Sequence, residues 1–211
     1  MSKDKTTDSF VPKYEHLIEE VLEHNYGYID QFIDAELTAG LRTILLENIE
    51  KGLMHPAGIG KRFSYTKNLK IRGDAICWIE KNSKKKPEMA FNEIIRELID
   101  HLNRTCYTGL NDYEFHYAAY DTGTFYKRHK DQFKADQGRK FSLVTYLNEE
   151  WTEADGGQLL LYLENETVEV MPKGGRSVFF RSDEIEHEVL PANRMRLSIA
   201  GWLKQLPDRR L

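Results

Sequence analysis

The chain has 211 residues, of which 30% are charged, and its formal net charge is −4 at pH 7. This length suits one domain with a full hydrophobic core, and the slight negative charge argues against a surface for sequence-independent nucleic-acid binding. We find no apolar signal core in residues 1–10 and no apolar run long enough to span a bilayer. Cys77 and Cys106 lack metal-site spacing. We therefore expect reduced, buried thiols in a cytoplasmic protein.

Three helices are predicted in the first half of the chain, where apolar residues recur three and four positions apart. The first follows Pro12, the second opens at the potential N-cap residue Asp34, and the third has Pro87 in its first turn. The apolar positions that define them are Leu17, Ile18, Val21, Leu22, Leu37, Leu41, Ile44, Leu45, Ile49, Phe91, Ile94, Ile95, Leu98 and Leu102. We expect these helices to support a sheet.

Short strands rich in aromatic and β-branched residues are predicted from Asp112 onward. They cover residues 113–120, 125–131, 141–147, 159–163, 167–171, 177–181 and 195–203. This pattern predicts an α+β, mainly β fold, a double-stranded β-helix (jelly roll) flanked by N-terminal helices. We expect one domain over residues 1–211, with helical support and a substrate loop over about 13–111 and the jelly-roll core over about 112–203.

The triplet His129-Lys130-Asp131 lies in one of these predicted strands. Because side chains alternate across a strand, His129 and Asp131 point to the same side and could share one metal ion. His187 could complete the set from a neighbouring strand. Two histidines and one carboxylate on one face are typical of non-haem Fe(II) sites, whereas zinc more often takes three or four closed ligands. The triplet alone is a weak signal, since such triplets also arise by chance.

Arg196 strengthens the metal hypothesis. It follows His187 by nine positions, in an apolar strand in which residues 194, 196, 198 and 200 share one face. A guanidinium inside a barrel needs an anion, and its planar fork fits a carboxylate. The natural anion is the distal carboxylate of 2-oxoglutarate. The alternative is a salt-bridged strand on the protein surface.

Several motifs occur in the order found in a known family. They are Ile71-Arg72-Gly73-Asp74, Trp78-Ile79-Glu80, Tyr120, His129-x-Asp131, Tyr146-Leu147-Asn148, Gly156-Gly157, His187-Glu188-Val189-x-Pro191, Arg196 and Trp202. Over about residues 25–203 the chain resembles the oxygen-sensing prolyl hydroxylases of the EGL-nine type. It is also similar to the related bacterial prolyl hydroxylases, in which the catalytic domain lacks long flanking regions.

The resemblance implies a complete set of metal and cosubstrate residues. His129, Asp131 and His187 would bind Fe(II), with 2-oxoglutarate and O2 as cosubstrates and ascorbate as a supporting reductant. Arg196 and Tyr146 would hold the distal carboxylate of 2-oxoglutarate.

Two further aromatic residues are implied by the same resemblance. Tyr120 would lie near the metal-chelating end of 2-oxoglutarate, and Trp202 would line the pocket. Without the resemblance, ordinary core packing would be an adequate explanation for Tyr146 and Trp202.

The Arg-Gly-Asp element resembles one that fixes a substrate-covering loop in this family. By analogy, Arg72 and Asp74 would belong to that loop, and Asp74 would pair with Arg139. Residues 55–62, rich in glycine and proline, are predicted to form a mobile loop, and loops with glycine hinges often close over bound substrate. The alternative is that Lys61, Arg62, Lys67 and Lys70 solvate a surface connection. The sequence of residues 132–138 differs from that of the oxygen-sensing enzymes, so the resemblance does not identify the substrate. Thr145 replaces an aromatic residue, which would alter how tightly 2-oxoglutarate is held.

We expect a dioxygenase that hydroxylates a prolyl residue in a protein or peptide and releases succinate and CO2. A protein of the translation machinery is one possible substrate, and neither nucleic acid nor membrane is expected as a partner. The alternatives are a hydroxylase of free proline or another small molecule, a non-catalytic metal-binding jelly-roll module, and a zinc hydrolase. Arg196 argues against the hydrolase, because zinc hydrolysis needs no dicarboxylate anchor.

Overall fold

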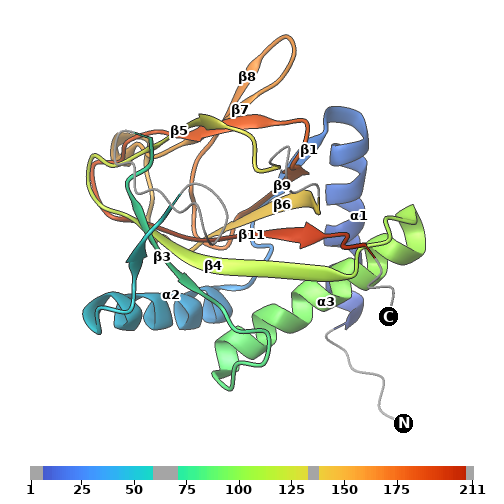
Figure 1. Cartoon of the computed structure of the whole chain (residues 1–211), viewed down its shortest axis with the longest axis horizontal. Helices are drawn as coiled ribbons and strands as arrows, with labels where there is room; N and C mark the ends of the chain where they lie inside the picture. The colour runs from blue at the N-terminus through green and yellow to red at the C-terminus, as the bar shows by residue number, and fades with distance from the viewer. Residues whose placement is uncertain (1–6, 59–70, 133–137, 208–211) are drawn as a thin grey trace.

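The computed structural model describes residues 7–58, 71–132 and 138–207 (Figure 1). Its helices are α1 (Thr7–His24), α2 (Ala35–Glu50), α3 (Lys86–Cys106) and a 3-10 turn (Glu153–Asp155). Its strands are β1 (Tyr26–Ile29), β2 (His55–Pro56), β3 (Asp74–Trp78), β4 (Asp112–Tyr120), β5 (Tyr126–His129), β6 (Arg139–Tyr146), β7 (Leu159–Tyr162), β8 (Thr167–Val170), β9 (Ser177–Arg181), β10 (Glu186–Val189) and β11 (Arg196–Lys204).

Two antiparallel sheets face each other. The large sheet has the strand order β1-β9-β6-β11-β4-β3-β2, and the small sheet has the order β5-β10-β7-β8. In Figure 1 the small sheet lies above the large one, while α2 and α3 lie below the large sheet and α1 stands beside them. The predicted jelly roll flanked by N-terminal helices is confirmed.

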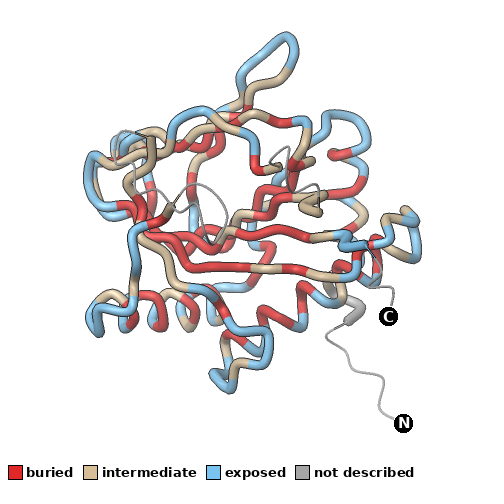
Figure 2. Tube along the Cα trace, viewed as in Figure 1, coloured by how far each residue is buried: buried red, intermediate tan, exposed pale blue. Residues whose placement is uncertain are grey.

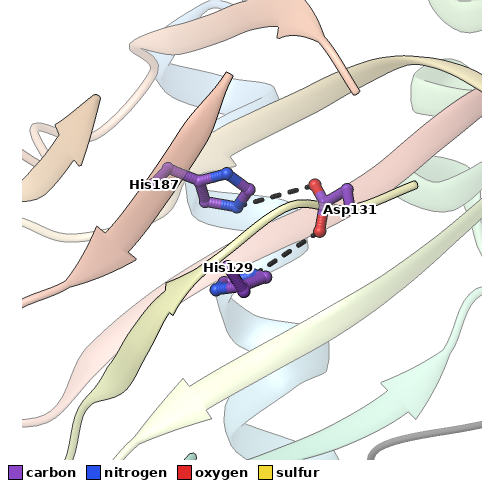
Figure 3. A group of neighbouring side chains, drawn as sticks. All are labelled: His129, Asp131 and His187. Carbon is purple, nitrogen blue, oxygen red and sulfur yellow. Dashed lines mark ion pairs between the residues drawn. The ribbon is translucent and has the colours of Figure 1, made fainter. Parts of the chain in front are cut away.

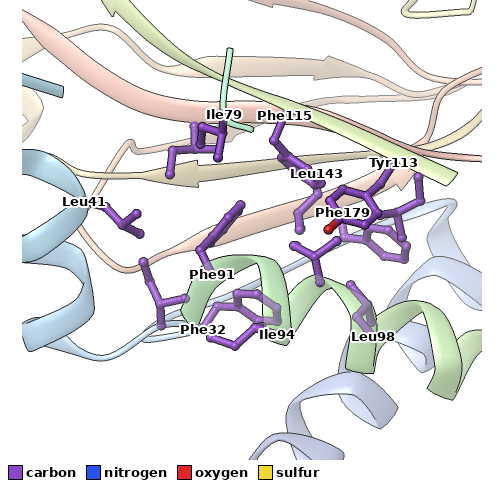
Figure 4. Close-up of a cluster of buried hydrophobic side chains, with 14 of the residues drawn as sticks. Phe32, Leu41, Ile79, Phe91, Ile94, Leu98, Tyr113, Phe115, Leu143 and Phe179 are labelled. Atoms are coloured by element: carbon purple, nitrogen blue, oxygen red, sulfur yellow. The ribbon is translucent and has the colours of Figure 1, made fainter. Parts of the chain in front are cut away.

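Alternation along the strands of the large sheet separates two cores. Phe115, Leu143 and Ile199 point to the outer face and pack against the helices, in one cluster with Phe91 and Leu98 of α3 (Figure 4). The residues that alternate with them point to the inner face, toward the small sheet. The second core there is made of Ala118, Tyr120, Tyr146, Leu159, Leu161, Val170, Val178, Phe180, Ile185 and Val189. Figure 2 shows runs of buried residues along the strands of this sheet.

Local signals place the ends of two helices correctly. The Asp34 side chain accepts a hydrogen bond of 2.7 Å from the Leu37 amide, which confirms the predicted N-cap of α2. Pro87 lies in the first turn of α3, as predicted. The first helix differs, because α1 begins at Thr7 and includes Pro12, at the cost of one helix hydrogen bond. Leu22 was predicted to lie in its apolar stripe, but it is 78% exposed.

Three strands before residue 112 were not predicted. β1 and β3 have four and five residues, β2 has two, and all three join the large sheet. Such short segments carry little periodic signal. Part of the predicted loop 55–62 and most of segment 132–138 lie outside the described residues.

Both cysteines are unpaired, as predicted, although they are half-buried rather than buried. Within the three described ranges, no helix is both long and apolar enough to cross a membrane.

Candidate functional site

Three predicted metal ligands meet between the two sheets. His129 is the last residue of β5, and it lies opposite His187 of β10 in the register of the small sheet. Asp131 follows two residues later, beyond the end of the strand, rather than inside it as predicted. The possible ligand atoms of these three residues all lie within 4.8 Å of one another (Figure 3). Nε2 of each histidine faces the carboxylate, at 3.5 Å for His129 and 3.6 Å for His187.

Backbone carbonyls fix the two histidines in one tautomer. Nδ1 of His129 donates to the Lys127 carbonyl at 2.7 Å, and Nδ1 of His187 lies 3.4 Å from the Ile185 carbonyl. A carbonyl only accepts, so each proton is on Nδ1 and each Nε2 lone pair is available to a cation. The Tyr126 ring stacks on His129 with a centroid distance of 3.5 Å. The ligand histidines are therefore oriented before any metal binds.

Asp131 is held in its charged form. The Ser142 hydroxyl donates to Oδ2 of Asp131 at 2.7 Å, and Ser182 lies 2.8 Å from the same hydroxyl. Burial alone would raise the pKa of Asp131, but His187, His129 and the Ser142 hydrogen bond hold this pKa well below its ordinary value. Burial lowers the pKa of His187 to about 4. A carboxylate beside the neutral His187 imidazole is the protonation state that a metal cation requires.

Ser142 was not predicted, and its contact with Asp131 gives a testable result. We expect Ser142→Ala to weaken Fe(II) binding by about 10–100-fold, because outer-shell hydrogen bonds orient metal ligands. Calorimetric titration with Fe(II) under anaerobic conditions measures this effect. The matched control is Ser177→Ala, which removes a buried hydroxyl bonded to Thr145 at 2.7 Å on the opposite face of the sheet. Equal affinities in the two variants would contradict a role for Ser142.

Arg196 is a buried cation at the start of β11. Its side chain is only 1% exposed, and its Nε donates to the Gly157 carbonyl at 2.8 Å. Nη2 of Arg196 and the Tyr146 hydroxyl are buried and have no hydrogen-bond partner within the described part of the chain. Burial raises the pKa of Tyr146, so its hydroxyl stays a neutral donor. A buried guanidinium and a free phenol donor together fit one end of a carboxylate ligand.

Glycine at position 157 is a steric requirement for this arrangement. Its φ is +69°, and a Cβ there would lie 3.1 Å from Cδ of Arg196 and 2.9 Å from the Ala192 Cβ. Any other residue would be strained and would press on the arginine. The Gly156-Gly157 motif therefore shapes the cation site.

The two other predicted aromatic residues lie at different points of the inner face. Tyr120 is the register partner of Arg196, and its ring lies 5.1 Å from the guanidinium carbon. Trp202 is six residues further along β11, opposite Ser142 of β6. Along the sheet, Trp202 therefore lies closer to Asp131 than to Arg196.

The predicted pair between Asp74 and Arg139 does not form. Asp74 accepts two hydrogen bonds from Arg72, at 2.7 Å and 2.5 Å, whereas Arg139 pairs with Glu114 at 2.9 Å. Asp74 lies opposite Tyr120, at one end of β4, and the register of β6 places Arg139 toward the other end. The Arg72 guanidinium lies 4.2 Å above the Tyr126 ring, which in turn stacks on His129. Arg72 and Asp74 therefore adjoin the metal ligands.

Thr145 points away from the cation site, and its effect on 2-oxoglutarate binding stays a prediction. By alternation it points to the face opposite Tyr146, and it is bonded to Ser177 at 2.7 Å. Residue 145 therefore faces the outer side of the large sheet, which the helices cover.

Residues 115–204 match the family model of the 2OG-Fe(II) oxygenase superfamily. A crystal structure of a Pseudomonas putida prolyl-4-hydroxylase is 33% identical, with a TM-score of 0.83, over 92% of this chain and 100% of that one. A Trichoplax adhaerens prolyl hydroxylase in complex with a hypoxia inducible factor peptide fragment is 24% identical, with a TM-score of 0.86, and covers 97% of this chain and 94% of that one, a likeness of fold.

A curated relative matches over a shorter segment. The prolyl 3-hydroxylase OGFOD1 of Xenopus laevis is 32% identical over 77 residues, which are 31% of this chain and 15% of that protein. The match to the Pseudomonas enzyme, in contrast, extends over almost the whole of both chains. The chain therefore belongs to the prolyl hydroxylase family of the 2OG-Fe(II) oxygenases.

Proposed function

We propose that this protein hydroxylates a prolyl residue in a protein or peptide, using O2 and 2-oxoglutarate and releasing succinate and CO2. One observation carries the proposal. The group formed by His129, Asp131 and His187 lies on the same inner face as a buried arginine, Arg196, and the unpartnered Tyr146 hydroxyl. The first three residues suit Fe(II), and the other two suit the far carboxylate of 2-oxoglutarate.

The proposed roles follow from the atoms that each residue leaves available. His129 and His187 would offer Nε2 and Asp131 a carboxylate oxygen, with Ser142 holding that carboxylate in place. Arg196 would compensate the distal charge of the cosubstrate, since no carboxylate among the described residues forms an ion pair with it. When bound, Fe(II) and 2-oxoglutarate supply the oxidising chemistry, in which one atom of O2 enters succinate and the other enters the product hydroxyl. The protein positions the reactants and excludes water.

A peptide substrate is favoured over free proline by the surroundings of the site. The inner face of the large sheet continues from Ser142 to Trp78, which is 49% exposed at the end of β3, beyond the two residues that pair with β2. Free proline is too small to contact this surface while it is bound at the metal. The related enzymes named above attack either carbon 3 or carbon 4 of proline, so both products are candidates. A translation-machinery protein as the substrate and a cytoplasmic location stay predictions from sequence.

The test is hydroxylation of a peptide library in which each peptide has one central proline. The Fe(II)-loaded protein, given 2-oxoglutarate and O2, should add one oxygen atom to a subset of these peptides. Mass spectrometry detects the addition, and amino-acid analysis distinguishes 3-hydroxyproline from 4-hydroxyproline. Free proline is the comparison substrate. Hydroxylation of free proline alone would favour the small-molecule alternative, and iron binding without any oxidation would favour the non-catalytic module.

A further inference from the structure

The strand that carries His129 contains a β-bulge. Tyr126 and His129 are three positions apart on β5, but they lie opposite residues 189 and 187 of β10, which are two positions apart. In a regular strand, residues 126 and 129 would point to opposite faces. The extra residue turns both to the inner side and leaves residues 127 and 128 exposed. The bulge therefore brings the Tyr126 ring beside the imidazole of His129.

The rings of Tyr126 and His129 form a close stack. Their centroids are 3.5 Å apart, and their planes are inclined by 17°. Nδ1 of His129 also donates to the carbonyl of Lys127, one of the two exposed bulge residues, at 2.7 Å. The carbonyl fixes the direction of one edge of the imidazole, and the stack fixes its plane. Rotation of the imidazole is therefore restricted by two contacts that both depend on the bulge.

His129 needs this support more than His187 does. β5 is the edge strand of the small sheet, and His129 is its last residue. His187 is flanked by β5 and β7, and its side chain is 6% exposed, against 16% for His129. Residues at the end of an edge strand have few neighbours and open easily. The Tyr126 ring supplies a rigid neighbour at this point.

Arg72 covers the Tyr126 ring from the other side. Its guanidinium carbon lies over the ring, 4.2 Å from the centroid, and the stacked imidazole already occupies one face. The guanidinium donates two hydrogen bonds to the fully buried carboxylate of Asp74, at 2.7 Å and 2.5 Å. Arg72 also forms a β-bridge with Tyr126, whereas Asp74 begins β3 of the large sheet. The tyrosine ring is therefore held between His129 and a side chain anchored on the opposite sheet.

We propose that Tyr126 is a positioning residue for His129, and that Arg72 holds the tyrosine ring against the imidazole. This inference rests on the proposed function, in which His129 binds the metal. A restricted imidazole has less freedom to lose when the metal binds, so the affinity is higher. An imidazole bound to a cation is also electron-poor, and the negative face of the tyrosine ring favours it.

The first test is calorimetric titration of Zn(II) into the metal-free protein. We expect Tyr126→Leu to raise the Kd about 3–10-fold, the effect of one aromatic pair. Tyr126→Phe keeps the ring and should stay within about twofold of the wild type. The matched control is Tyr162→Leu, because Arg128 covers the Tyr162 ring at 3.9 Å on the outer face of the small sheet. This control should leave the Kd as in the wild type.

Arg72→Lys tests the role of the guanidinium. A lysine keeps the positive charge beside Asp74 but lacks the planar group that covers the Tyr126 ring. We expect this variant to raise the Kd for Zn(II) about 2–5-fold, the effect of one cation–π contact. A Kd equal to that of the wild type would overturn the role assigned to Arg72.

A measurement on the wild type keeps the inference testable if Tyr126→Leu does not fold. In the nuclear magnetic resonance spectrum of the metal-free protein, stacking should shift the ring protons of His129 upfield. Their signals are identified by their absence from His129→Ala. Ring protons at their ordinary positions in the wild type, or an unchanged Kd in a folded Tyr126→Leu variant, would overturn the inference.

The same experiments separate this inference from the proposed function. If the wild type binds Zn(II) and hydroxylates library peptides while Tyr126→Leu binds Zn(II) equally well, the proposed function stands and the inference fails. Failure of the wild type to bind any metal would count against the proposed function, and against the inference with it.

Discussion

Replacing His129 with alanine is expected to abolish succinate formation and to weaken Fe(II) binding by about a hundredfold or more. Structural zinc sites gain about 10–16 kcal/mol from four ligands, so one ligand contributes about 2.5–4 kcal/mol. His129 also has its Nε2 oriented by the Lys127 carbonyl, so little reorganisation is needed when a metal binds. The loss should therefore be close to the full contribution of one ligand.

The measurement is anaerobic titration with Fe(II), followed by exposure to O2 and quantification of succinate from 2-oxoglutarate. His101→Ala is the control, because His101 is also buried but bonds to Glu15, a contact between α3 and α1 away from the inner face. We expect the control to bind iron normally. Succinate formation by His129→Ala at the wild-type rate would refute the assignment of His129 as a ligand.

Replacing Arg196 with alanine is expected to raise the KM for 2-oxoglutarate by about 30-fold or more while leaving Fe(II) affinity intact. Truncating one partner of a buried, hydrogen-bonded charge pair costs about 2–5 kcal/mol, since the other charge is left buried and unpaired. Arg196→Lys should recover part of this loss, because an ammonium supplies charge but cannot form the planar, two-bond contact.

Arg194→Ala is the matched control for Arg196. Arg194 lies two positions away along the same segment, and it pairs with Asp155 at 2.8 Å near the protein surface. Its removal should change the KM for 2-oxoglutarate by less than about twofold, as for most surface substitutions. Equal KM values in the two variants would show that Arg196 does not bind the cosubstrate. Succinate assays over a range of 2-oxoglutarate concentrations decide between these outcomes.

Features with local causes could be predicted from the sequence. Asp34 caps α2 and Pro87 opens α3 because each effect depends on residues in the same turn. Alternation along β11 also placed Arg196 on the inner face. β10 was missed, since Glu186, His187 and Glu188 give it no apolar character. Pairing with β5 and β7, distant in sequence, makes it a strand.

Features that depend on strand register could not be predicted. The predicted contact between Asp74 and Arg139 is wrong because the two residues lie at opposite ends of the sheet, as the register of β4 and β11 shows. The periodicity of a single strand does not reveal this register. Ser142 and Tyr146 lie on the same face of β6 by alternation, so the inward direction of Ser142 could be predicted from the sequence. The contact between Ser142 and Asp131 could not be predicted, because Asp131 lies beyond the end of its strand.

The central place of β11 also sets the order in which the protein can assemble. β11 follows the other ten strands of the described residues, yet it pairs with β4 on one side and β6 on the other. During synthesis, β4 and β6 must therefore wait for residues 196–204 before the middle of the sheet closes. Pairings between such distant segments are slow to form and expose strand edges meanwhile. Because Arg196 belongs to this strand, the nascent chain has no complete proposed cosubstrate site until β11 has been added to the sheet.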